Sequence, residues 1–145
     1  MDIALEETVD LWPKDLFEFR INTPLAIMKE QASLLTKKSN HRLRAEVETR
    51  ATGGDKFRHI FYLIVPALED YRYELFEIEH GVLPYPLTII SQPGIAIIFG
   101  SKPIVKGFGS DPINSETEFV DWLKGVLQST ATKKIIGSLF AQFGT

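Results

Sequence analysis

The residues best suited to chemistry in this chain are one histidine and two glutamates on three neighbouring segments. His59 lies in FRHIFYLIV, Glu48 in HRLRAEVETR and Glu77 in YRYELFEIEHG. If the intervening turns are symmetric about Gly53-Gly54 and about Leu68, the two glutamates lie on either side of His59 in a sheet. Two carboxylates favour the protonated imidazole, so this row could act as a general acid and base.

The same row also has a purely structural interpretation. Opposite charges that face each other across neighbouring strands stabilise a sheet by about 0.2–1 kcal/mol per pair. The sequence shows no Ser/His/Asp spacing and no other positioned nucleophile beside the row. His59, Glu48 and Glu77 are therefore candidates for a catalytic site, with a sheet-stabilising charge row as the alternative.

Other patterns that could support chemistry are incomplete. Glu77, Glu79 and His80 are close in sequence, but successive side chains of a strand point to opposite faces. The chain has 3 histidines and no cysteine, so we predict no metal site and no cofactor, and we expect His80 to mark only the end of a strand. The loop GFGSDP contains a single G-x-G without the rest of a phosphate-binding motif.

Hydrophobic patterns define the elements that must position these residues. The alternation in DLFEFRI, residues 15–21, predicts a strand, and Thr23 followed by Pro24 predicts a helix that ends near residue 38. Strands are expected at the three segments named above. A hairpin around SQPG should join PLTII to IAIIFG. Ser115 and Glu118 match the start of a helix, and a final helix follows STAT.

This order of elements predicts the α+β class. We expect an antiparallel sheet of about five to six strands, built as a meander plus a hairpin, with one N-terminal and two C-terminal helices in a single domain over residues 1–145. The symmetric turns also predict an apolar face for the first helix to cover. Its cross-strand pairs would be Leu43 with Ile64, Ala45 with Tyr62, and Val47 with Ile60.

Composition restricts the class of protein. Hydrophobic residues make up 44% and charged residues 24% of the 145, which is typical of a folded domain. The net charge of −3 gives no general attraction for nucleic acid, and the one basic stretch, KKSNHRLR, is followed by Glu46 and Glu48. The acidic N-terminus does not resemble a signal peptide, and no apolar run reaches the roughly 20 residues of a membrane span. We expect a cytoplasmic protein without membrane or nucleic-acid partners.

A band of aromatic residues gives the leading functional hypothesis. Tyr71, Tyr73 and Leu75 share one predicted strand face, with Arg42 and Arg44 near its border. Tyrosine and arginine often carry the binding energy of protein interfaces. Either the C-terminal helices cover this band, or it remains exposed and binds a partner.

We therefore expect a small interaction protein that binds another protein through a sheet face or edge, in an antitoxin-, immunity- or chaperone-like role. A second copy of the chain is the other partner considered. The alternatives are a small enzyme that uses His59 and a carrier with a small-molecule pocket between the sheet and the C-terminal helices.

Overall fold

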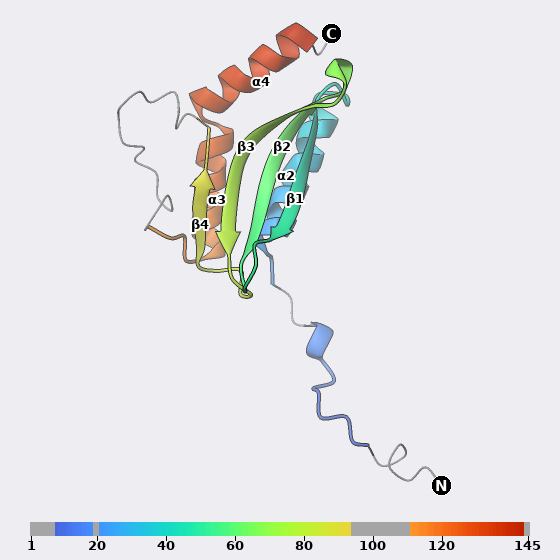
Figure 1. Ribbon diagram of the computed structural model, residues 1–145, viewed down its shortest axis with the longest axis vertical. Helices are drawn as coiled ribbons and strands as arrows, with labels where there is room; N and C mark the ends of the chain where they lie inside the picture. Colours follow the sequence, from blue (N-terminus) through green and yellow to red (C-terminus); the bar gives the residue numbers. More distant parts are fainter. Residues whose placement is uncertain (1–7, 19–20, 94–110, 144–145) are drawn as a thin grey trace.

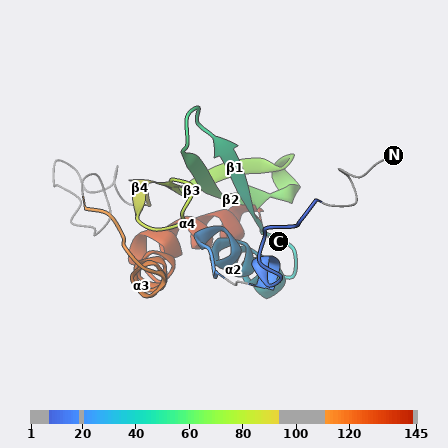
Figure 2. The same ribbon diagram turned by 90° about the horizontal axis from the view of Figure 1, so that it is seen from below.

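A single antiparallel sheet carries the helices of the described chain on one of its two faces (Figures 1 and 2). The computed structural model describes residues 8–18, 21–93 and 111–143. Its elements in chain order are the 3-10 turn η1 (Leu16–Glu18), α2 (Pro24–Lys38), β1 (Arg44–Ala51), β2 (Phe57–Val65), the 3-10 turn η2 (Pro66–Leu68), β3 (Tyr71–His80), β4 (Leu87–Ser91), α3 (Glu116–Leu127) and α4 (Thr130–Phe143). The α+β class, and one helix before and two after the sheet, are confirmed.

The four described strands follow one another in the order β1-β2-β3-β4. The five-residue connection between β1 and β2 contains Gly53 and Gly54, both at φ +75°, where glycine avoids the steric cost of a side chain. The five to six strands expected from the sequence thus become four in the described residues. IAIIFG, predicted as a further strand, lies outside those residues.

Helix starts follow the capping signals of the sequence. The Thr23 hydroxyl accepts a hydrogen bond from the Ala26 amide at 3.2 Å, and Pro24 is the first helical residue. The Ser115 hydroxyl accepts one from the Glu118 amide, also at 3.2 Å. Each cap supplies an acceptor to a backbone amide that has no partner within the helix. Both predicted helix starts are confirmed.

The core lies between the sheet and the helices. Phe61 of β2 stacks on Phe76 of β3 with ring centroids 5.2 Å apart, and Trp122 of α3 meets Phe76 edge-on at 5.2 Å. From α2, Met28 is fully buried in the same cluster. Of the predicted aromatic band, Leu75 is buried in this core and Tyr73 packs against it, whereas Tyr71 is 46% exposed.

The strand predicted at 15–21 is wrong in its described part. Leu16–Glu18 form a 3-10 turn, with hydrogen bonds from the Leu16 amide to the Pro13 carbonyl and from the Glu18 amide to the Asp15 carbonyl. No strand of the described sheet pairs with this segment, so alternation alone could not stabilise an extended chain. Residues 19–20 lie outside the description. Among the described helices, none is long and apolar enough to cross a membrane.

A buried histidine pair and a groove between two helices

His59 pairs with His80 on the helix-covered side of the sheet. The two Nε2 atoms are 2.7 Å apart, the Nδ1 of His59 is 2.9 Å from the hydroxyl of Thr49, and the Nδ1 of His80 is 2.6 Å from the carbonyl oxygen of Gly81. His59 is only 3% exposed. β1, β2 and β3 each contribute a side chain, so the pairing of the three strands positions this cluster.

The hydrogen-bond pattern assigns one proton to each neutral ring. A carbonyl only accepts, so the Nδ1 of His80 must carry its proton and the Nε2 of His80 must accept. The Nε2 of His59 then donates to His80, and the Nδ1 of His59 accepts from the hydroxyl of Thr49. The three hydrogen bonds therefore form a series in which each group donates to the next, from the Thr49 hydroxyl through His59 and His80 to the Gly81 carbonyl.

This surrounding opposes a positive charge on His59. Burial lowers the pKa of His59 from 6.5 to about 4, and the electrostatic effects of His80 and Lys29 act in the same direction. His59 is consequently neutral near pH 7, with both ring nitrogens engaged inside the protein. A substrate would have to displace Thr49 or His80 to reach it.

The predicted row of His59 between Glu48 and Glu77 is not formed. The residue opposite both glutamates is Ile60. The pairing of β1 with β2 differs by one residue from the predicted register, and a bulge at Phe61/Tyr62 shifts the pairing of β2 with β3 by one residue as well. His59 faces Thr49 and Ile78 instead. A shift of one residue moves a strand side chain to the other face, so the glutamates and the histidine lie on opposite sides of the sheet.

The same shift corrects the predicted apolar pairs. Ala45 lies opposite Leu63 and Val47 opposite Phe61, and α2 covers their side of the sheet. His80 ends β3, as expected, and it is also the hydrogen-bond partner of His59. The only sequence signal for this pair is that one histidine lies near the start of β2 and the other at the end of β3, which are neighbouring positions in an antiparallel hairpin.

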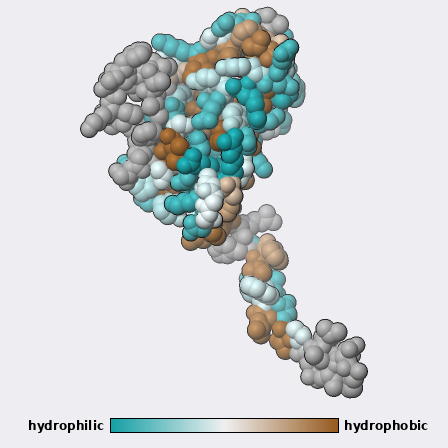
Figure 3. All heavy atoms as spheres, in the orientation of Figure 1, coloured by the Kyte–Doolittle hydropathy of each residue, from teal (hydrophilic) through white to brown (hydrophobic). Residues whose placement is uncertain are grey.

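The sheet face away from the helices is a network of charged side chains, and Figure 3 shows it as largely hydrophilic. Arg72 lies 4.3 Å from the ring centre of Tyr62 and forms ion pairs at 3.8 Å with Glu46 and Glu48. Burial, followed by repulsion from Glu74, raises the pKa of Glu77. Beneath these side chains Ile60 and Ile64 are almost completely buried. The charged network thus covers apolar residues that none of the described helices covers.

The four residues predicted to bind a partner are distributed over two surfaces. Arg44 forms ion pairs with Glu46 at 3.4 Å and with Asp70 at 3.6 Å on the charged face. Arg42 lies 5.9 Å from the ring centre of Phe140 in α4. Tyr71 and Tyr73 lie on the other face, beside α4, where they line a shallow cavity. The structure does not bring the four together in one patch, and their binding role stays a prediction.

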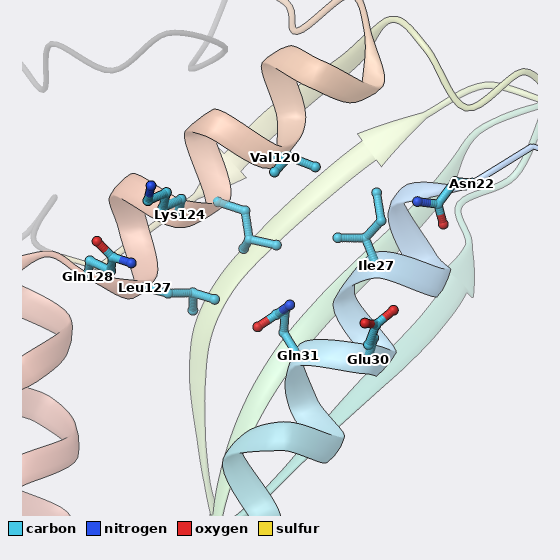
Figure 4. A pocket seen from close by; sticks show the side chains of 9 residues that line it. Asn22, Ile27, Glu30, Gln31, Val120, Lys124, Leu127 and Gln128 are labelled. Carbon is cyan, nitrogen blue, oxygen red and sulfur yellow. The ribbon is translucent and has the colours of Figure 1, made fainter. Parts of the chain in front are cut away.

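A groove runs between α2 and α3 above the middle of the sheet. Its first part has a volume of about 420 Å³, and Figure 4 shows Ile27 and Gln31 of α2 facing Val120 and Leu127 of α3 across it. A second part of about 220 Å³ continues past Gln31 and Leu127 toward α4. The lining of this second part is mostly apolar: Leu34, Leu35, Phe61, Leu75, Leu127 and Ile136, with Gln31 and Lys38.

The groove combines an apolar floor with apolar edges. Leu34 on α2, in the second part, and Val120 on α3, in the first part, are each 42% exposed, whereas Phe61 and Leu75 are the buried floor of the second part. Because α2 lines it from Ile27 to Lys38, a rise of 1.5 Å per residue gives a length of about 17 Å along the helix. Sequence reasoning did not predict a groove beside α2; it considered only a small-molecule pocket between the sheet and the C-terminal helices.

Comparison with family models, curated proteins and solved structures gives no match to this chain. Among the described residues, no group of three or more His, Asp or Glu side chains is placed to hold a metal ion. Function is therefore inferred from the geometry of the groove and of the histidine pair.

Proposed function

We propose that this protein binds a segment of another polypeptide chain in the groove between α2 and α3. The observation that carries the proposal is that Leu34 on α2 and Val120 on α3, at the edges of the two parts of the groove, are exposed, while Phe61 and Leu75 form a buried apolar floor under the second part. Helices that complete their own core bury such side chains against each other. Here they face water, as do the walls of grooves that accept an apolar peptide or helix.

The shape of the groove favours a polypeptide over a small molecule. Small-molecule sites enclose most of the ligand surface. This groove is open along one side and about 17 Å long on the same helical rise, which suits several consecutive side chains of a peptide. Polar groups at its edge, such as Gln31 and Gln128, can pair with the peptide backbone.

The proposal keeps the interaction role expected from the sequence and moves it to another surface. The charged sheet face has its arginines engaged in ion pairs with neighbouring carboxylates, so a partner would have to replace contacts already made. The apolar groove offers surface that gains free energy when water leaves it. A chaperone-like or immunity-like role is compatible with binding of this kind.

Peptide selection from a random display library tests the proposal. We expect the protein to enrich peptides with two or more large apolar residues. Their affinity, measured by fluorescence anisotropy, should fall at least about tenfold in the double variant Leu34→Glu/Val120→Glu, since two carboxylates would have to be desolvated (about 1.4 kcal/mol per factor of ten).

The matched control is Val82→Glu/Leu83→Glu, which adds the same charges at two exposed apolar residues outside the groove. The control should bind the selected peptides as the native chain does. The proposal is refuted if no peptide is enriched, or if the groove variant binds the enriched peptides as tightly as the native chain.

A further inference from the structure

The N-terminal arm, defined as residues 8–18, exposes apolar side chains on a locally ordered turn. Leu11 is 89%, Trp12 72% and Phe17 94% exposed. Figures 1 and 3 show the arm extending away from the sheet and helices, with brown residues along it. Large apolar side chains gathered on one exposed segment indicate a contact with another surface.

Hydrogen bonds within the arm hold its turn. A carboxylate oxygen of Asp10 accepts from the Trp12 amide at 3.0 Å. The Glu18 amide donates to the Asp15 carbonyl at 3.0 Å and the Leu16 amide to the Pro13 carbonyl at 3.3 Å. A segment that already holds its conformation loses less entropy when it binds. The arm is therefore built like a ligand, with tryptophan and phenylalanine as anchors.

We propose that the arm occupies the groove between α2 and α3 of a second copy of the chain; this rests on the proposed function, for which it names the partner. The arm extends away from its own helices, so a receptor on another molecule meets it without a reversal of the chain. The groove, about 17 Å along α2, is an apolar surface that the arm can fill, since the nine residues from Val9 to Phe17 span at most about 30 Å when extended and their turn makes them shorter.

Charge and connection support the same pairing. The arm carries Asp10, Asp15 and Glu18 against one lysine, Lys14, whereas the groove edges carry two lysines, Lys38 and Lys124, against Glu30. The acidic arm and the more basic groove edges therefore attract each other.

Asn22, four residues after the last residue of the arm, lies at one end of the groove. Asn22 lines the groove and donates a hydrogen bond from Nδ2 to a carboxylate oxygen of Glu116 at 3.2 Å, which links the starts of α2 and α3. Two copies related by a twofold axis near this end can each insert an arm into the other. Such an exchange is closed, because both arms and both grooves are used.

Sedimentation equilibrium of the full chain measures the exchange. We expect a dimer whose dissociation constant rises at least about tenfold in the arm variant Trp12→Ser/Phe17→Ser and in the groove variant Leu34→Glu/Val120→Glu. The control Val82→Glu/Leu83→Glu should remain dimeric. Mixing the two variants should restore a heterodimer, because one intact arm then meets one intact groove.

Three results overturn the inference. A native chain that is monomeric at 100-fold the concentration used for peptide binding has no such exchange. A dimer that survives in the groove variant places the arm elsewhere. Variants that do not complement each other rule out a shared contact. If display peptides still require the groove in any of these cases, the proposed function stands and only its assignment to the arm of a second copy fails.

Discussion

Replacement of His59 by glutamine removes the one buried imidazole whose pKa is lowered to about 4. Above pH 6.5 the imidazole is neutral in both the folded and the unfolded chain, so its ionisation does not affect stability. Below pH 6.5 the unfolded chain takes up a proton that the folded chain does not. Stability is thus lost as the pH falls from about 6.5 toward 4, and the loss is complete below 4.

The size of this loss follows from the two pKa values. The full difference between 6.5 and about 4 corresponds to about 3 kcal/mol, at 1.36 kcal/mol per pH unit. Between pH 7.5 and pH 5.0 the expected loss is about 2 kcal/mol, since the unfolded imidazole is then almost fully protonated and the folded one is not. The raised pKa of Glu77 affects the pH dependence of stability with the opposite sign, but it does so equally in the native chain and in the His59→Gln variant.

Urea unfolding at pH 7.5 and 5.0 measures the difference. Between these two pH values the native chain should lose about 2 kcal/mol more free energy of unfolding than the His59→Gln variant. His41→Asn, which removes an exposed histidine at a left-handed φ of 65°, is the control and should keep the native loss. Equal losses in the native chain and in His59→Gln would refute the reasoning. Should His59→Gln fail to fold, an NMR titration of the native imidazole should still give a midpoint near pH 4.

Four further substitutions test the packing and the backbone. Phe76→Ala should lower the free energy of unfolding by about 3–5 kcal/mol, because it empties the centre of the aromatic cluster, and a loss below 1 kcal/mol in urea unfolding would contradict this. Arg72→Ala should cost about 0.5–1 kcal/mol through the lost contact with Tyr62 and two exposed ion pairs, and high salt should reduce that cost. Gly54→Ala should destabilise the fold by about 1 kcal/mol at φ +75°, whereas Gly125→Ala, inside α3 with open space around it, should stabilise it by about 0.5–1 kcal/mol; thermal unfolding that gives both changes the same sign would count against this account.

The candidate site could be predicted only in part from the sequence. His59 was selected as the histidine with partners across the sheet, but the partners are Thr49 and His80 and not two glutamates. The selection depended on the strand order, which alternation and turns indicate. The error came from the register, which a single residue in a turn or a bulge changes.

The sequence by itself determined those features that depend on near neighbours. Thr23 with Pro24, Ser115 with Glu118, and the two glycines of the first hairpin act within a few residues of themselves, so their effects do not depend on the rest of the fold. The order of β1, β2 and β3 follows from short connections of the same kind.

Only the tertiary structure decided which side chains meet. The bulge beside Leu75 allows Leu75 and Phe76, neighbours in sequence, to be buried in the same core, and this packing sets the face on which Glu77 lies. The groove depends on the separation of α2 and α3, which is fixed by the side chains beneath both helices. Alternative contacts between residues distant in sequence compete during packing, and the local sequence pattern around each residue does not determine which of these contacts forms.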